Sequence, residues 1–250
     1  RPGCIYQGCR SGVESMRYMG SKARHTKQIV PSVLEGHDKS SWYIEPFFGG
    51  GNLFSCVNVS LKWGNDTSYY AVSLLEALSN GWSVPTSLSE KGYNQIKSDP
   101  ESYDPALVGF AAYCCSYAGK FWGGYARGKD SKGIERNFAA EQARNVEKQR
   151  SGLIGSEFTV GSYLDMQIPK SSTVYCDPPY AGTTGYQSGF DSQEFWDWCE
   201  GLVERNCRVF VSEYEAPECW TCVWEKTVTN SLTKDTGSKK GTEKLFTMIK

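Results

Sequence analysis

A carboxylate, two prolines and an aromatic ring stand together at Asp177-Pro178-Pro179-Tyr180. Residues 173–176 before them favour a strand, so Asp177 is expected at a strand's carboxyl end, where open α/β sheets bind ligands. The prolines restrict the backbone, which would hold the Asp177 carboxylate and the Pro178 carbonyl as two rigid hydrogen-bond acceptors. With the Tyr180 ring beside them, these acceptors suit a planar group that donates N–H bonds. Asp and Pro are also common in turns, so this stretch alone does not separate a binding site from a turn.

A second stretch suits a ligand that approaches the backbone closely. Within residues 42–54 an apolar strand ends at Glu45, and Phe47-x-Gly49-x-Gly51 follows. Consecutive glycines turn tightly and leave room for a ligand. The third glycine of the dinucleotide fingerprint is absent because position 54 is Phe, which argues against NAD and FAD. We expect the turn to lead into a helix that runs to about Ser60.

Two charged residues could hold other parts of such a ligand. Asp66 follows Gly49 by 17 residues, close to the spacing of about 20 for an acid that accepts ribose hydroxyls. It lies between an expected strand over 61–64 and an expected helix over 69–78, so it could also be the cap of that helix. Lys22 opens a helical pattern after Gly20, where a lysine suits a carboxylate ligand or simply points into solvent.

The alternation of strands and helices stops between residues 81 and 155. Helices are expected over about 105–117 and 135–150. Between positions 120 and 150, eight basic residues stand against four acidic ones. Glycine-hinged aromatic residues among these charges suit phosphate contacts and base stacking, although a charged helix is often only a solvated surface.

The rest of the chain returns to strand and helix patterns. We expect strands over 157–160, 161–165 and 208–212, a terminal strand over 244–249, and a helix over about 191–205. The whole pattern predicts an α/β protein with a Rossmann-like sheet that carries helices on both faces.

Composition restricts the class of protein. The chain of 250 residues has 22% charged and 14% aromatic residues, as folded globular proteins do, and its net charge of -1 means that any DNA-binding surface must be a local patch. No apolar run approaches the ~20 residues that cross a bilayer, so no membrane segment is expected. Residues 1–15 lack the apolar middle of a secretion signal, and we expect them to be a poorly ordered leader or an artificial tail.

Cysteine and histidine chemistry is not expected to carry the function. The ten cysteines are spread along a chain of ordinary apolar content, so most should be buried free thiols. Cys219-x-x-Cys222 has redox or zinc spacing, but no second pair completes a zinc site. His25 and His37, the two histidines, have no partner at the spacing of metal ligands or a catalytic triad. No metal is therefore expected.

Four motifs in order resemble those of the amino-methyltransferases that modify adenine N6 in DNA, and particularly the phage-encoded members of the Dam subgroup. They are Tyr18-Met19-Gly20-Ser21-Lys22, Phe47-x-Gly49-x-Gly51, Asn65-Asp66 and Asp177-Pro178-Pro179-Tyr180. The resemblance covers residues 16–250. It implies a Rossmann-like methyltransferase domain built from 16–80 and 156–250, and an inserted, mainly helical target-recognition subdomain over 81–155.

The chain departs from the family pattern at three places. Glu45 stands where Asp is frequent, and Thr67 and Ser68 follow Asp66 where an apolar residue and Asn are usual. The basic segment does not align with the hairpin that reads GATC in Dam, so the resemblance does not give a recognition sequence.

The resemblance implies S-adenosylmethionine as the cofactor. Tyr18 and Lys22 would lie against its methionine part, and Asp66 would accept its ribose hydroxyls. The backbone of Tyr163 would meet its adenine. Phe47, Gly49 and Gly51 would form the turn around it.

The resemblance also implies double-stranded DNA as the partner and a flipped-out adenine as the target. Asp177, Pro178, Pro179 and Tyr180 would hold the target adenine. The DNA strand would meet Lys120, Arg127, Lys129 and Arg136. We expect a monomer or weak dimer in the cytoplasm of a bacterium or of a phage-infected host. Alternatives are methylation of cytosine N4 or of RNA, an inactive DNA-binding protein of the same fold, and a secreted binding module rich in cysteine.

Overall fold

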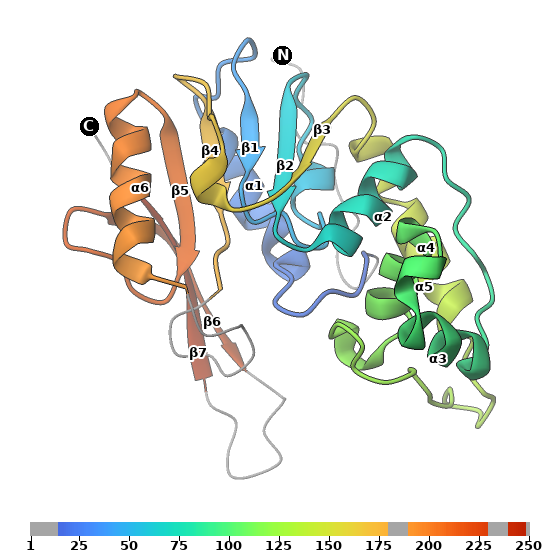
Figure 1. Cartoon of the computed structure of the whole chain (residues 1–250). Coiled ribbons are helices and arrows are strands. Elements are labelled where there is room, and N and C mark those ends of the chain that lie inside the picture. The colour runs from blue at the N-terminus through green and yellow to red at the C-terminus, as the bar shows by residue number, and fades with distance from the viewer. Residues whose placement is uncertain (1–14, 180–189, 230–239, 249–250) are drawn as a thin grey trace, which may run out of the picture.

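The computed structural model describes residues 15–179, 190–229 and 240–248, and its centre is one mixed sheet (Figure 1). The seven strands follow the order β3-β2-β1-β4-β5-β7-β6. The five parallel strands are β1 (Tyr43–Glu45), β2 (Lys62–Asp66), β3 (Glu157–Val160), β4 (Thr173–Cys176) and β5 (Arg208–Glu213). β7 (Lys240–Thr247) is antiparallel to β5 and to β6 (Thr221–Thr229).

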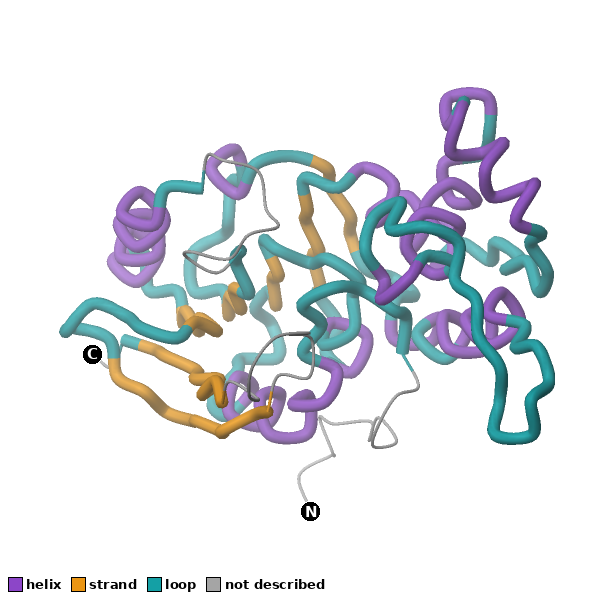
Figure 2. Tube along the Cα trace, turned by 90° about the horizontal axis from the view of Figure 1, so that it is seen from below, coloured by secondary structure: helices purple, strands orange, loops and turns teal. Residues whose placement is uncertain are grey.

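Side chains alternate between the two faces of the sheet, and both faces are buried. Tyr43 and Tyr175 belong to the core shared with α1 (Thr26–Leu34) and α2 (Tyr69–Ser79). Ile44 and Val174, their strand neighbours, belong to a second core with α6 (Ser192–Glu204). This is the period of two that strands impose. Helices lie on both sides of the strands in Figure 2, so the predicted α/β class with a Rossmann-like sheet is confirmed.

Residues 81–155 are mainly helical and lie at the end of the sheet beside α2 (Figure 1). Their helices are α3 (Glu90–Ser98), α4 (Pro105–Gly109), a π-helical turn (Phe110–Cys114) and α5 (Phe138–Glu147), with 3₁₀ turns at Pro100–Ser102, Tyr117–Gly119 and Arg150–Gly152. Phe110 and Val146 are buried in the same core as α1 and α2. The helical segment is therefore packed directly against the sheet layer.

Two local predictions were wrong. The helix expected to run to about Ser60 is a single 3₁₀ turn over Phe54–Cys56. The buried ammonium of Lys62 donates to the carbonyls of Phe54 and Val57, which a continuing helix would have used itself. The expected strand over 161–165 contains the 3₁₀ turn Tyr163–Asp165, whose start is capped by the Ser162 hydroxyl. A further 3₁₀ turn, Ala23–His25, precedes α1.

Among the described residues seven cysteines are free thiols, five of them buried, whereas Cys56 is disulfide-bonded, so five of the ten cysteines are buried free thiols where most were predicted to be. No group of three or more His, Cys, Asp and Glu side chains in the described ranges could hold a metal ion. Among the same residues, no helix combines the length and the apolar character needed to cross a membrane.

Candidate active site

The carboxyl ends of the parallel strands carry the acids singled out in the sequence. β1 ends at Glu45, β2 ends at Asp66, and Asp177 directly follows β4. The strand order reverses between β1 and β4, and open α/β sheets bind ligands outside the carboxyl ends at such a point. The predicted position of Asp177 at the end of a strand is confirmed. Pro178 is buried and Pro179 half-buried, whereas Tyr180 lies outside the described residues.

The turn after β1 has the geometry that only glycine adopts easily. Gly49 and Gly51 have φ values of 51° and 62°, in the left-handed region. A Cβ atom at Gly49 would lie 2.9 Å from the ring of Tyr18. The Tyr18 ring in turn lies beside that of Tyr113, with 5.0 Å between ring centroids. The structure thus brings together Tyr18, Gly49 and Gly51, three of the residues predicted to hold a cofactor.

Asp66 fastens the glycine turn to β2. Its carboxylate accepts from the backbone N–H of Gly49 at 2.7 Å and of Ser68 at 2.9 Å. Burial raises the pKa of Asp66, although the N–H groups that donate to it oppose the increase. The cap of α2 is Ser68 and not Asp66, because the Ser68 hydroxyl accepts from the backbone of Ala71. A carboxylate has about four acceptor positions, so Asp66 retains capacity for ligand hydroxyls.

Aromatic rings line the other side of the turn. The rings of Phe47 and Tyr163 lie 5.1 Å apart between centroids, and Phe190 and Phe195 pack against both. Burial, with the negative charge of Glu194 nearby, raises the pKa of Tyr163 to about 12. The predicted pair of Phe47 and Tyr163 therefore forms an apolar wall beside the glycine turn.

Lys22 lies against two carboxylates. Its ammonium is 3.0 Å from Oδ1 of Asp177 and 3.5 Å from Oε2 of Glu243, which lies on β7. The side chains of Lys22, Asp177 and Glu243 are only 7%, 20% and 15% exposed. Burial acts to lower the pKa of Lys22, but the charges and hydrogen bonds of the two carboxylates outweigh it and raise that pKa. Glu243 was not predicted as a site residue, because no motif surrounds it.

A third carboxylate, Glu45, is buried next to this cluster. It accepts a hydrogen bond of 2.6 Å from the Tyr43 hydroxyl. Burial raises the pKa of Glu45 to about 8 against the effects of Tyr43 and Lys62, and the charge of Asp177 adds to the increase. Burial likewise lowers the pKa of Lys62 to about 8, against the attraction of Glu45.

Two amide side chains join the glycine turn to the segment that carries Tyr18 and Lys22. Gln149 donates to the Gly50 carbonyl at 3.0 Å and to Asn52 at 3.1 Å, and it accepts from the backbone N–H of Met16 at 3.1 Å. Asn52 donates to the Met16 carbonyl and to the Ser21 hydroxyl. Both amides are buried, so they hold this part of the site with satisfied hydrogen bonds.

The basic residues predicted to bind DNA lie on the exposed surface of the helical segment. Three of them pair with acids within it: Arg127 with Glu90, Lys129 with Glu135, and Arg136 with Glu141. Lys120 is exposed, as are the rings of Tyr117 and Phe121 near it in the chain. Within the described residues, the ion pairs and hydrogen bonds of these basic side chains are with acids of the helical segment, and none of them is with Asp177 or the glycine turn.

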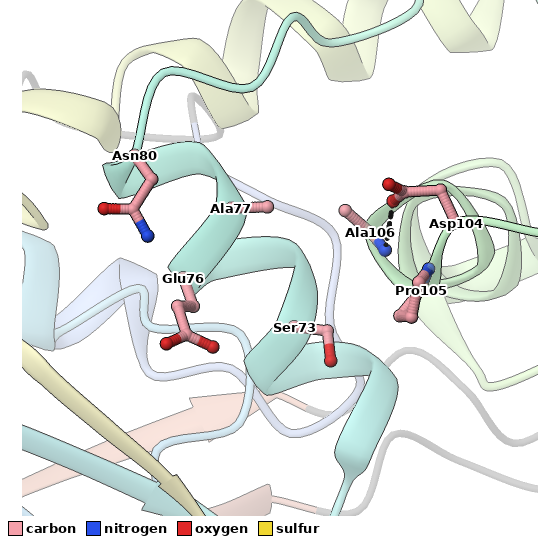
Figure 3. Close-up of a pocket in the computed structure, with 7 residues that line it drawn as sticks. All are labelled: Ser73, Glu76, Ala77, Asn80, Asp104, Pro105 and Ala106. Atoms are coloured by element: carbon pink, nitrogen blue, oxygen red, sulfur yellow. Dashed lines mark hydrogen bonds between the residues drawn. The ribbon is translucent and has the colours of Figure 1, made fainter.

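An open pocket of about 240 Å³ lies elsewhere, between α2 and the start of α4 (Figure 3). Its lining residues are Ser73, Glu76, Ala77, Asn80, Asp104, Pro105 and Ala106. The Asp104 carboxylate points at the backbone N–H of Ala106 and accepts a hydrogen bond from it, as the N-cap residue of a helix does. The pocket contains none of the predicted site residues.

Comparison with known proteins gives two findings. Residues 18–106 match the model of the D12 class N6 adenine-specific DNA methyltransferases. The Type II methyltransferase M.FokI of Planomicrobium okeanokoites is 25% identical over an alignment of 217 residues, and the match covers 73% of this chain and 31% of M.FokI. The chain thus spans about a third of the length of that relative. The resemblance to adenine-N6 methyltransferases predicted from the motifs is confirmed.

Proposed function

Since this chain is similar to the D12 class of adenine-specific DNA methyltransferases, we propose that it transfers a methyl group from S-adenosylmethionine to N6 of a flipped-out adenine in double-stranded DNA. One observation carries the proposal. The segment 18–22 contacts both the glycine turn and Asp177, because Tyr18 lies on the turn and Lys22 pairs with Asp177. A cofactor on the turn would therefore stand beside the carboxylate that receives the amine.

The residues around the turn fit the cofactor. The positive φ of Gly49 and Gly51 forms a tight turn against which the Tyr18 ring packs, and Asp66 beside it offers a carboxylate for ribose hydroxyls. Phe47 and Tyr163 offer an apolar wall for an adenine ring. When bound, S-adenosylmethionine supplies an electrophilic methyl group on a sulfonium. Lys22 already holds two carboxylates, so the contact predicted between Lys22 and the cofactor carboxylate requires a third anion at one ammonium.

Asp177 and the Pro178 carbonyl would act on the target amine. The lone pair of an adenine amino group is delocalised into the ring, which makes it a weak nucleophile. Two acceptors for its two N–H bonds favour a tetrahedral nitrogen and stabilise the positive charge that develops on it. Rigid placement of the amine supplies a further part of the rate. We propose that Tyr180 stacks on the base.

The target base must leave the duplex before these groups can reach it, which costs a few kcal/mol. We propose that the helical segment 81–155 recognises the DNA, with Lys120, Arg127, Lys129 and Arg136 at the phosphates. The three ion pairs lie at the surface, with Glu141 the least exposed of the acids at 27%, and surface pairs contribute about 0–1 kcal/mol. Phosphate groups can therefore replace these acids at small cost.

Methyl transfer from tritiated S-adenosylmethionine to duplex DNA of diverse sequence tests the proposal. The wild-type protein should label the DNA, and digestion to nucleosides should place the label in N6-methyl-2′-deoxyadenosine. Asp177→Ala should abolish the transfer while it still binds the cofactor. Background label with every DNA would refute the proposal, and label in cytosine or only in RNA would assign a different substrate.

A further inference from the structure

Glu243 is a buried acid that shares the Lys22 ammonium with Asp177. On the basis of the proposed function, we propose that Glu243 is a positioning residue. It draws Lys22 partly away from Asp177, so that the Asp177 carboxylate remains an effective acceptor for the target amine.

Strand geometry explains why this carboxylate reaches the site. Side chains two residues apart in a strand point to the same face. Leu245 and Tyr175 both lie on the α1 face of the sheet, so Glu243 and Asp177, two positions from each, are directed to that face as well. Lys22 precedes the 3₁₀ turn that leads into α1 and meets both carboxylates there. β7 is therefore the element that supplies the second anion.

The charges explain what the second anion does. With Lys22 alone, the Asp177 carboxylate would be neutralised and one of its oxygens would be occupied by a strong donor. Positive charge that develops on the amine would then face no net negative charge. Glu243 offers Lys22 a second acceptor and leaves the three groups with a net charge of about −1, which favours a cationic transition state.

A further cation, Lys226, stands directly opposite Glu243 on β6, but its side chain is exposed, so solvent and salt screen its charge. His25 packs beside Trp224 near Glu243, and burial lowers the pKa of His25, so its ring is neutral at neutral pH. A simple surface ion pair between Lys22 and Glu243 does not describe the site, because both side chains are largely buried. The buried Lys22 ammonium therefore stays between the two carboxylates, because breaking a buried ion pair is costly.

The experiment compares Glu243→Gln with wild-type protein in the methyl-transfer assay. The amide keeps the shape of the side chain and removes its charge, so kcat should fall roughly 10-fold. KM for S-adenosylmethionine and the Kd for DNA should stay within about 2-fold, because no ligand contact is lost. Glu243→Asp should restore part of kcat. Glu225→Gln, an exposed acid of β6, is the matched control and should leave kcat unchanged.

A double-mutant cycle tests whether Glu243 acts through Lys22. In a Lys22→Met background, Glu243→Gln should change kcat by less than about 2-fold. An undiminished effect in that background would overturn the proposal, as would wild-type kcat in Glu243→Gln or a loss confined to KM. If Glu243→Gln does not fold, the same criteria apply to Glu243→Ala, which also removes the charge. Absence of transfer by the wild-type protein refutes the proposed function instead.

Discussion

Glu45→Gln should stabilise the protein at neutral pH. The carboxyl group of Glu45 is fully buried, and its pKa rises from 4.5 to about 8 on folding. The folded protein therefore keeps a proton that the unfolded chain releases between these values. A group with a raised folded pKa contributes stability that is present below pH 4.5 and lost as the pH rises towards 8. Gln resembles the protonated acid and does not titrate.

The size of the effect follows from the pKa shift. At pH 7 the unfolded carboxyl is about 2.5 units above its pKa, and each unit corresponds to about 1.36 kcal/mol, so the difference is on the order of 3 kcal/mol. The amide oxygen of Gln can still accept from the Tyr43 hydroxyl. Lys62 does not obscure the result, since its pKa falls from 10.5 to about 8 and its own contribution changes only above that pH.

Urea unfolding of both proteins at about pH 4.5 and about pH 7.5 measures the difference. Glu45→Gln should be the more stable protein at the higher pH and nearly equal at the lower one. Glu76→Gln, a change of an exposed acid on α2, should stay within about 0.5 kcal/mol at both. Equal stabilities of Glu45→Gln and wild type at the higher pH would mean that the Glu45 carboxylate is ionised in the folded protein.

Three further substitutions test the rest of the site. Gln149→Leu leaves the buried Gly50 carbonyl without its donor, so urea titration should show a loss of about 1–3 kcal/mol and initial rates a higher KM for S-adenosylmethionine. Gly51→Ala places a Cβ at a φ of 62° and 2.9 Å from the Phe48 ring, so calorimetry should show a lower Tm and a loss larger than the about 1–3 kcal/mol of backbone strain alone. The control Gly81→Ala has backbone strain at a φ of 92° but open space around its Cβ, so its loss should be the smaller of the two. Lys120→Ala should lower the slope of log K against log salt concentration for DNA binding, measured by anisotropy, by about 1. Arg127→Ala should lower that slope by less, because Arg127 has an acidic partner. Equal effects of the last two changes would show that the ion pair does not compete with DNA.

The acids at the sheet edge could be placed from the sequence because their signals are local. Strand-forming residues run directly into Asp177, and the same holds for Glu45 before the glycine turn. Asp66 is the last residue of its strand. The order of parallel strands then brings these ends together without further information. What they hold is a chemical inference from residue type, and it stays a prediction until methyl transfer is measured.

Elements that depend on distant partners were not predicted. β6 pairs only with β7, at the edge of the sheet, and carries a register shift between Cys222 and Trp224 that blurs its pattern. α3 buries only Tyr93 and Ile96, so its apolar stripe is short. The 3₁₀ turn after the glycine turn ends where the Lys62 ammonium donates to the carbonyls of Phe54 and Val57. Periodicity alone does not reveal such tertiary contacts.

The positioning residues of the site have no local signal at all. Gln149 bonds to Gly50 and Met16, which are 99 and 133 residues away in the chain. Glu243 lies just before the terminal strand expected over 244–249, and the pairing of β7 between β5 and β6 sets which face it meets. Such residues are found only when the fold has brought the segments together.

Three acids lie close together in the candidate site, Glu45, Asp177 and Glu243, and they differ in their surroundings. Burial keeps Glu45 protonated at neutral pH, so this acid adds no charge beside Asp177. Glu243 remains beside Lys22 and offsets the cation. The net negative charge is thereby concentrated at Asp177, the acid that directly follows β4 and faces the proposed target. A neutral Glu45 and a charged Glu243 are thus complementary: the first avoids repulsion of Asp177 by a neighbouring anion, and the second avoids its neutralisation by Lys22.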